Sequence, residues 1–272
     1  MTTIARSLAL SALAPVDAQV LLAHVLGCNR AWLVAHADDP LTPPDEAAFA
    51  ALAARRRDGE PVAYLTGTRE FFGLPLTVSP AVLIPRPETE TLVEVALARL
   101  PRNGSPRVLD LGTGSGAIAL AIARERPQAR IYACDACAEA IRVAHANAQR
   151  LNLTNLRFFV ADWYAGVPEL PFDVIVANPP YVAAGDPHLG QGDLRFEPAA
   201  ALSPGGDGLS ALRTIVAGAP ARLVPGGLLA VEHGYDQPGA VRALFGEAGF
   251  LAIVTHADLA GHARVTSGDA RG

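Results

Sequence analysis

The spacing of apolar residues divides the chain into a helical beginning, a short strand-like middle and a long alternating remainder. Between residues 1 and 66, apolar side chains recur at helical spacing, as Val16, Val20 and Leu21 illustrate. A second helical segment begins near Pro43 and ends near Arg57, within a run of three arginines that suits the negative end of a helix dipole. The pattern predicts a small helical bundle.

Helix bundles serve in many roles, so the pattern alone does not decide what this one does. One interpretation is a cap that assists folding or dimerisation. The other is a domain that recognises a partner. On the residues alone, both alternatives stay open.

The middle part of the chain consists of shorter, strand-like pieces. Segments 69–72 and 74–78 are separated by Gly73, and this pattern predicts a β-hairpin. We expect residues 67–85 to form a linker between the helical bundle and a second domain.

A proline-rich segment, residues 83–90, leads from the hairpin into an apolar helix. Pro87 suits the first turn of that helix, and Glu88 or Thr89 is placed to cap it. The simplest interpretation is a helix start with solvated charges. In the functional alternative, Arg86 and Glu88 face the mouth of a binding site.

From Arg107 onward, strand and helix patterns alternate, as they do in a mostly parallel sheet with helices on its faces. We expect an α/β fold, Rossmann-like in type, for residues 86–272. The predicted strands are 108–111, 130–134, 156–160, 172–177, 228–232, 250–255 and 263–266. The predicted helices are about 115–126, 136–151, 208–222 and 237–248.

Composition narrows the possible functions. The chain has 272 residues, half of them hydrophobic, which is enough for one large or two ordinary domains with buried cores. A net charge of −5 argues against a standing electrostatic attraction to nucleic acid. Every one of the 22 basic residues is arginine, so mechanisms that need a Schiff-base or P-loop lysine are excluded.

The cysteines and the hydropathy suggest a compartment. Three cysteines, Cys28, Cys134 and Cys137, are an odd number and do not make a disulfide framework, which fits a reducing environment. No apolar run reaches the roughly 18 residues that span a bilayer, and a secretory signal pattern is missing. We therefore expect a cytoplasmic protein without membrane association.

A glycine-rich turn follows the first strand of the alternating part. Gly112-Thr113-Gly114-Ser115-Gly116 lets the backbone turn sharply and approach a ligand closely. Its spacing differs from the G-x-G-x-x-G dinucleotide fingerprint. Asp110, just before it, would repel a pyrophosphate but suits a ligand that carries an ammonium and a sulfonium.

Acidic residues also follow the next two strands. Asp135 is placed to accept both hydrogens of a ribose diol. Asp162 is placed to accept an adenine amino group, while Trp163 packs against the ring. Taken singly, these residues are a helix cap, a turn and a core aromatic, but their order at successive strand ends describes a nucleoside site. The ligand that we infer is S-adenosylmethionine.

The fourth strand ends in Asn178-Pro179-Pro180-Tyr181. Neither proline has an N–H, so the peptide is stiff and offers carbonyl acceptors without competing donors. Asn178 adds a side-chain carbonyl, and Tyr181 adds a flat ring. We interpret the four residues as a catalytic clamp that holds a planar amide or amino group by its N–H atoms, although a plain proline turn has the same composition.

Other candidate sites are weaker. Cys134 and Cys137 have redox spacing but straddle Asp135 instead of opening a thioredoxin-like unit. The seven histidines show no paired ligand spacing, and we expect no metal. The polar segment 186–198, just after the clamp, is either a lid or substrate-contacting loop or a solvated excursion.

Five motifs together resemble those of the peptide chain release factor glutamine N5-methyltransferases. The motifs are Asp110 to Gly116, Asn178 to Tyr181, Leu83 to Glu90, Gly192 to Pro198 and Glu232 to Gly234. The resemblance covers nearly the whole chain and is weakest over residues 1–60. It implies a helical N-terminal domain, a hairpin linker and a class I methyltransferase domain.

The resemblance also implies roles for site residues. By it, Gly112 to Gly116, Asp135, Trp163 and Asn178 hold S-adenosylmethionine, with S-adenosylhomocysteine as the product, and the clamp holds the glutamine of a Gly-Gly-Gln motif. We add Arg86 and Glu197 as substrate-binding residues. Cys137 departs mildly from the family, in which a small hydroxyl residue is commoner at this position.

The implied partners are class 1 peptide chain release factors, and we expect a monomer without direct nucleic-acid binding. Two alternatives remain. A nucleic-acid adenine N6-methyltransferase would use the same clamp, but it must flip a base and hold a phosphate backbone, which the acidic charge balance disfavours. A non-catalytic binding module would not need the intact clamp.

Overall fold

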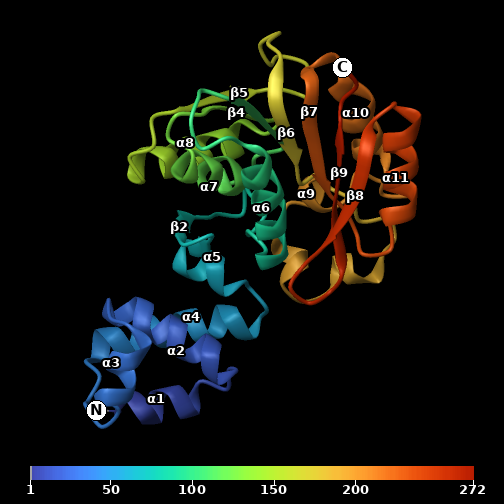
Figure 1. Cartoon of the computed structure of the whole chain (residues 1–272). Helices are drawn as coiled ribbons and strands as arrows, with labels where there is room; N and C mark the ends of the chain where they lie inside the picture. The colour runs from blue at the N-terminus through green and yellow to red at the C-terminus, as the bar shows by residue number, and fades with distance from the viewer. Residues whose placement is uncertain (1) are drawn as a thin grey trace. The chain divides into compact units, whose positions relative to one another are not determined.

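The computed structural model describes residues 2–272 and divides them into two compact units (Figure 1). One unit contains the chain up to Thr68 together with Gly190–Phe196. The other contains Arg69–Leu189 and Glu197–Gly272. The expected boundaries at residues 66 and 85 stay predictions.

Helices form the first unit up to Thr68. They are α1 (Ile4–Leu10), α2 (Pro15–Leu26), α3 (Arg30–Ala35), α4 (Pro43–Arg57) and α5 (Val62–Thr66). Their apolar faces enclose a core that includes Leu21, Leu22 and Phe49. The longer helices α2 and α4 were predicted, whereas α1, α3 and α5 are too short to show a clear helical period.

The segment Gly190–Phe196, which includes the 3₁₀ helix η3 (Gly192–Phe196), belongs to the helical unit. Arg56 forms ion pairs with Asp193 at 2.7 Å and with Asp17 at 2.8 Å. Arg195 donates a hydrogen bond to the carbonyl of Asp58. The middle of the polar segment predicted at 186–198 is therefore tied to α4 and is not a solvated excursion.

A seven-stranded sheet forms the centre of the second unit. Its strands are β3 (Arg107–Leu111), β4 (Arg130–Asp135), β5 (Leu156–Val160), β6 (Phe172–Ala177), β7 (Leu223–Glu232), β8 (Leu251–Ala257) and β9 (Ala263–Asp269). Their order is β5-β4-β3-β6-β7-β9-β8. β9 pairs antiparallel with β7 and β8, and the other neighbours are parallel. The predicted α/β, mostly parallel fold is confirmed.

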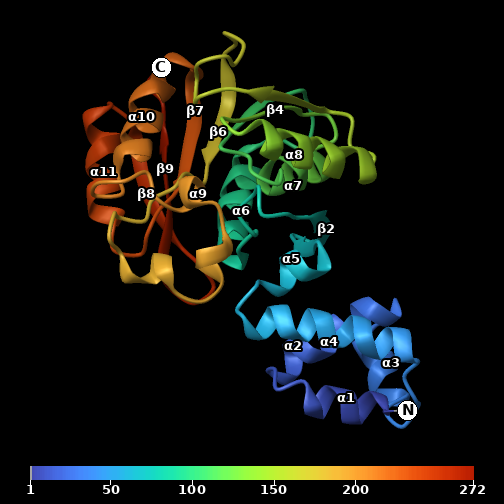
Figure 2. The ribbon, with the colours of Figure 1, turned by 180° about the vertical axis from the view of Figure 1, so that it is seen from behind.

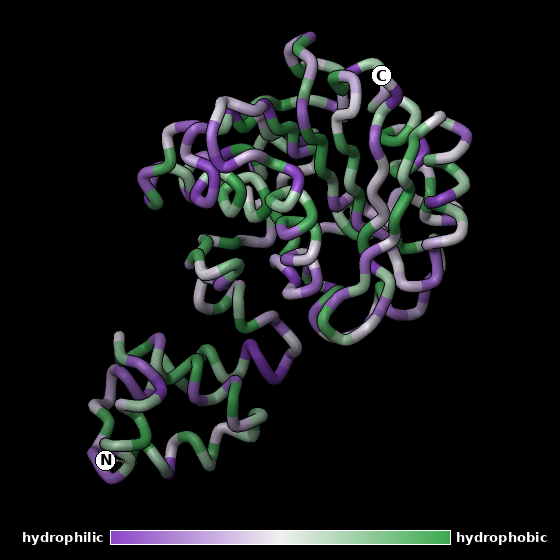
Figure 3. Tube along the Cα trace, viewed as in Figure 1, coloured by the Kyte–Doolittle hydropathy of each residue, from purple (hydrophilic) through white to green (hydrophobic). Residues whose placement is uncertain are grey.

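Alternate side chains of the central strands enter two separate cores. Val108 and Val174 pack with α6 (Glu90–Arg99), α7 (Ala117–Glu125) and α8 (Ala138–Arg150), while Leu109 packs with α10 (Ser210–Gly218) and α11 (Pro238–Glu247). Figures 1 and 2 show these two sets of helices on opposite sides of the sheet. Because both faces are covered, the central strands are hydrophobic along their length (Figure 3).

The remaining elements are short. They are the hairpin strands β1 (Thr68–Phe71) and β2 (Leu74–Thr77), the helix α9 (Ala199–Leu202) and the 3₁₀ helices η1 (Pro87–Thr89), η2 (Pro187–Gly190) and η4 (Ala219–Ala221). The predicted helix 208–222 is divided into α10 and η4, since Pro220 interrupts the helical hydrogen bonds. Within residues 2–272, no helix is long and apolar enough to cross a membrane.

Candidate active site

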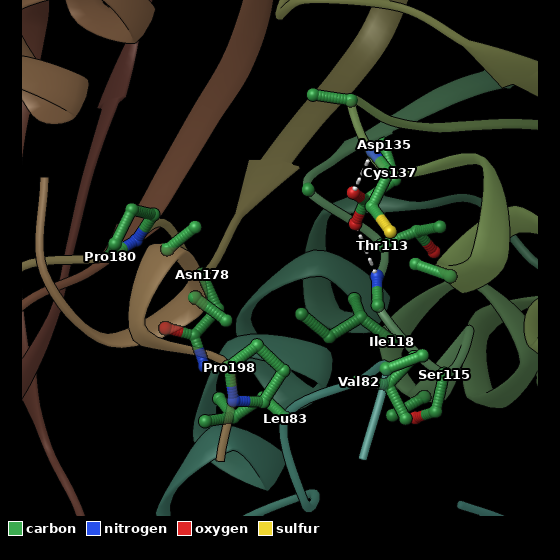
Figure 4. Close-up of a pocket in the computed structure, with 18 of the residues that line it drawn as sticks. Val82, Leu83, Thr113, Ser115, Ile118, Asp135, Cys137, Asn178, Pro180 and Pro198 are labelled. Atoms are coloured by element: carbon green, nitrogen blue, oxygen red, sulfur yellow. Dashed lines mark hydrogen bonds between the residues drawn. The ribbon is translucent and has the colours of Figure 1, made fainter. Parts of the chain in front are cut away.

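The order of the strands reverses at β3, because β4 and β5 lie on one side of it and β6 and β7 on the other. In open α/β sheets, ligands bind at the carboxyl ends of the strands at such a point. A cavity of about 290 Å³ lies there, lined by residues that follow β3, β4, β5 and β6. Figure 4 shows Asn178, Pro180 and Pro198 on one side of it, and Thr113, Asp135 and Cys137 on the other.

The glycine-rich turn after β3 forms one wall of this cavity. Gly112 and Gly114 have φ of 75° and 56°, in the left-handed region that favours glycine. Residues 112–115 line the cavity. Asn147, on α8, supports the turn from behind by donating a hydrogen bond to the carbonyl of Ser115 at 2.9 Å.

Gly116 differs from Gly112 and Gly114, because it faces the protein core and not the cavity. Its φ is 86°, and a Cβ atom there would lie 2.9 Å from Leu120 Cδ1 and 3.2 Å from Ala144 Cβ. The absence of a side chain therefore lets α7 begin close to α8. The structure does not place Gly116 in the cavity wall, so its predicted cofactor contact stays a prediction.

We expect Gly116→Ala to lower the free energy of unfolding by about 2–4 kcal/mol, because strained backbone and a steric clash add together. The matched control is Gly114→Ala, where a Cβ atom would meet nothing within 4 Å. That change should cost only the backbone strain, about 1 kcal/mol. Urea unfolding measures both values, and equal losses would contradict the packing role of Gly116.

Asp135 holds the glycine-rich turn and the start of the next helix together. Its Oδ2 accepts a hydrogen bond from the backbone N–H of Gly114 at 3.0 Å, and its Oδ1 accepts one from Cys137 at 2.9 Å. The carboxylate also lines the cavity. Because each carboxylate oxygen has a further lone pair, Asp135 can still accept hydroxyl hydrogens from a ligand.

Asp110 lies beneath the turn and not in the cavity wall. It is fully buried, and Oδ2 accepts a hydrogen bond from the Thr113 hydroxyl at 2.6 Å, while Oδ1 has no hydrogen-bond partner. Burial raises the pKa of Asp110 to about 7. The sequence suggested a direct neighbour of a cationic ligand; the structure instead shows a carboxyl group that supports Thr113, one layer behind the cavity.

The residues after β5 form another part of the wall. Asp162 is exposed and lines the cavity together with Trp163. Trp163 has a positive φ of 48°, and its ring lies 3.6 Å from the position of a Cβ atom on Gly112. The indole ring therefore packs at van der Waals distance from the turn, and its predicted contact with an adenine ring stays a prediction.

Only part of the Asn178–Tyr181 clamp faces the cavity. Asn178 and Pro180 line it, whereas Pro179 and Tyr181 do not. The Asn178 amide nitrogen donates a hydrogen bond to the Thr89 hydroxyl at 3.1 Å. The ring of Tyr181 packs into the core beside α10 and α11, and its hydroxyl donates to Glu232 at 3.2 Å, so Tyr181 supports the clamp from behind.

The contact between Thr89 and Asn178 corrects the sequence analysis. Thr89 precedes α6, but its side chain makes no capping hydrogen bond to that helix. Of the two predicted caps, Thr89 and Glu88, Thr89 occupies the N-cap position, but its hydroxyl accepts a hydrogen bond from Asn178 and makes no capping bond. This role could not be seen in the sequence, where the two residues are 89 positions apart.

Arg86 and Glu197 meet at the edge of the cavity. The Glu197 side chain is fully buried, pairs with Arg86 and accepts a hydrogen bond from the backbone N–H of Ile84 at 3.0 Å. Arg86 lines the cavity, whereas Glu197 does not. Glu197 therefore orients Arg86 and anchors the chain before Pro198, and its predicted contact with a substrate stays a prediction.

Sequence reasoning missed the apolar part of the cavity. The wall includes Val82, Leu83, Ile118, Pro198 and Ala201. Such residues cannot be distinguished from ordinary core residues by composition, because both kinds of position favour apolar side chains. The run of prolines near residue 85 was the only signal, since it marks a rigid segment.

The fold and the site together define a methyltransferase of the Rossmann-like class. The methyltransferase small domain model matches residues 89–255, and the PrmC N-terminal domain model matches residues 2–67. The sheet also resembles that of the Thermus thermophilus 16S rRNA N2 G1207 methyltransferase, with a TM-score of 0.54 and 24% identity over 75% of this chain and 50% of that one. At this identity, the likeness shows the fold alone.

Closer relatives give the particular family. The chain is 54% identical to the release factor glutamine methyltransferase of Burkholderia pseudomallei, over 98% of this chain and 95% of that protein. It is 48% identical to the Escherichia coli protein of the same name, over 93% of this chain and 91% of that protein. The chain belongs to the release factor glutamine methyltransferase family, as its motifs predicted.

Proposed function

We propose that this protein transfers a methyl group from S-adenosylmethionine to the side-chain amide nitrogen, N5, of the glutamine in the Gly-Gly-Gln motif of class 1 release factors. The observation that carries the proposal is the orientation of Asn178. Its amide nitrogen is held by Thr89 at 3.1 Å, so its oxygen remains for a ligand in the cavity. The names of the relatives agree with this activity.

The cavity residues fit S-adenosylmethionine, which supplies an electrophilic methyl group on a sulfonium when it is bound. Asp135 has acceptor capacity for a ribose diol beyond its two backbone hydrogen bonds. Asp162, Trp163 and residues 112–115 line the cavity, and we assign the first two to the adenine ring and the others to the remainder of the ligand. The buried Asp110 contributes by holding Thr113 in place.

An amide nitrogen is a poor nucleophile, so methyl transfer requires that the clamp position it. We infer that Asn178 Oδ1 accepts one N–H of the substrate amide, which aligns the nitrogen with the methyl group. Pro179 does not line the cavity, and we keep its carbonyl as the predicted acceptor of the second N–H. A bound S-adenosylmethionine would supply the methyl group, with a nitrogen–carbon bond formed as the sulfur–carbon bond breaks. The nitrogen then loses one proton to water, and no protein base is required because the methylated amide is strongly acidic before that loss.

We keep the proposed division into a helical bundle at residues 1–66, a linker at 67–85 and a catalytic domain at 86–272. The match of the PrmC N-terminal domain to residues 2–67 supports the first boundary. We propose partner recognition as the role of the bundle, because a release factor is a protein substrate, and a purely structural cap stays the alternative. A release factor substrate also implies work in the cytoplasm.

The direct test is mass spectrometry of a purified release factor after incubation with the enzyme and S-adenosylmethionine. We expect one added methyl group on the Gly-Gly-Gln glutamine, and none on a release factor whose glutamine is replaced by alanine. Nuclease treatment should not change the result. Methylation of DNA or RNA in place of the release factor would instead support the adenine N6-methyltransferase alternative.

A further inference from the structure

A buried polar group stands behind the clamp and has no part in the proposed chemistry. Glu232, the last residue of β7, is 1% exposed. Its Oε1 accepts the hydrogen bond from Tyr181, and its Oε2 is buried without a hydrogen-bond partner. Burying a carboxyl group without full hydrogen bonding costs free energy, so a carboxyl group at this position suggests a role connected with the clamp.

Thr89 lies between Glu232 and Asn178. It is 4% exposed, and its hydroxyl oxygen accepts the hydrogen bond from the Asn178 amide nitrogen. The same hydroxyl lies near Glu232 and lowers the pKa of that carboxyl group. Three elements far apart in the sequence, η1, the end of β6 and the end of β7, thus meet in one chain of polar groups.

The charge state of Glu232 sets the direction of the hydrogen bonds among these polar groups. A carboxylate only accepts hydrogen bonds, so an ionised Glu232 favours the orientation in which the single hydroxyl hydrogen of Thr89 points toward it. The lone pairs of that hydroxyl then face Asn178, and only the nitrogen side of the carboxamide fits against them. The opposite orientation would place two acceptors, Thr89 Oγ1 and Asn178 Oδ1, against each other.

We propose that Thr89 and Glu232 are positioning residues for methyl transfer, which fix the orientation of the Asn178 carboxamide so that its oxygen faces the substrate nitrogen. This inference rests on the proposed function of the clamp. An Asn side chain alone has two orientations of nearly equal shape, and only one of them presents an acceptor to the substrate. Neither residue touches the reacting atoms; both act through Asn178.

Thr89→Val keeps the size of the side chain and removes the hydroxyl, whereas Thr89→Ser keeps the hydroxyl. We expect Thr89→Val to lower kcat by about 10- to 100-fold, the effect of one lost orienting hydrogen bond. The affinity for S-adenosylmethionine should not change, and Thr89→Ser should retain most of the rate. The matched control is Thr214→Val on α10, an exposed threonine that bonds only its own helix, and it should leave kcat unchanged.

The pH dependence gives an independent test. Burial raises the pKa of Glu232 to about 7, against the lowering effects of the Thr89 and Tyr181 hydroxyls and of Arg264, while Glu88 raises it. Below that pKa, the protonated carboxyl becomes a donor, and Thr89 is free to donate to Asn178 Oδ1. We therefore expect kcat to fall as the pH drops through about 7.

Glu232→Gln removes the titrating group at nearly constant shape. We expect a lower kcat in this variant and the loss of the fall in kcat near pH 7. The measurement is made at saturating cofactor, because burial also raises the pKa of Asp110, beneath the cofactor turn, to about 7. An identical pH profile in Glu232→Gln, or an unchanged kcat in Thr89→Val, would overturn the inference.

These results are distinguishable from a failure of the proposed function. If the wild-type enzyme adds no methyl group to a release factor glutamine, the proposed function is wrong, whatever the variants do. If the wild type methylates the glutamine but Thr89→Val and Thr89→Ser both behave like it, only the positioning role is wrong. Equal losses in Thr89→Val and Thr89→Ser would show that packing, and not the hydroxyl, matters at this position.

Discussion

Asn178→Ala is expected to abolish detectable methyl transfer, with a loss in kcat of at least about 10²- to 10³-fold. The variant lacks the carbonyl oxygen that we propose accepts one N–H of the substrate amide. It also removes the donor to the Thr89 hydroxyl. Steady-state transfer of labelled methyl groups to a release factor measures the loss, and titration with S-adenosylmethionine should show binding within severalfold of the wild-type value.

Two further variants make this result specific. Asn178→Asp keeps an acceptor toward the substrate but replaces the donor to Thr89 by a carboxylate oxygen, so it should also be severely impaired. Asn103→Ala, an exposed residue ahead of the amino end of β3, should be as active as the wild type. Unchanged turnover in Asn178→Ala would show that the clamp is not the catalytic element.

The second large effect is expected at Asp135. Asp135→Ala should weaken the binding of S-adenosylmethionine by about 10²-fold, the equivalent of about 3 kcal/mol for lost hydrogen bonds to a charged group. The carboxylate holds the N–H groups of Gly114 and Cys137, so its removal disturbs the turn as well as the proposed ribose contact. Isothermal titration calorimetry with the cofactor measures the change.

Asp135→Asn is the informative companion, because the amide retains one acceptor oxygen at the same position. It should bind the cofactor with an affinity between those of the wild type and Asp135→Ala. At saturating cofactor, both variants should recover much of their kcat, since Asp135 does not contact the transferred methyl group in our proposal. A large loss of kcat with normal cofactor affinity would place Asp135 in the chemistry and refute the binding role.

Local signals in the sequence were sufficient to predict most strands of the sheet. Strands such as β3 and β6 are buried on both faces, so they appear as continuous apolar runs bounded by turn residues. The strand β7 shows where such signals fail. It begins at Leu223, five residues before the prediction, and continues through Pro225 and two glycines, residue types that sequence rules exclude from strand interiors.

The start of β7 is stabilised by neighbours that no local pattern reveals. Its register against β6 shifts between Phe172 and Val174, and the N–H of Gly226 donates to the carbonyl of Ala270 at 3.1 Å. The irregularity allows proline and glycine to remain in the ladder. The prediction began the strand five residues too late because propensity is a local quantity, whereas these hydrogen bonds are tertiary.

The sequence by itself determined the class of fold, the family and the residues at the carboxyl ends of the strands. It could do so because turns, glycines and the Asn178–Tyr181 motif are local features with fixed spacing. Only the tertiary structure decided which of these side chains face the cavity. Asp110, Gly116 and Tyr181 all belong to motifs, yet they lie behind the wall and support it.

The tertiary structure alone also revealed the contact of Thr89 with Asn178 and the buried carboxyl of Glu232 beside it. These residues are separated by more than 50 positions in the chain, and each has an ordinary local explanation as a helix cap, a turn residue or a strand end. A hydrogen-bond network depends on directions and distances between elements that are packed together. Those quantities exist only once the sheet has brought the ends of β6 and β7 beside η1.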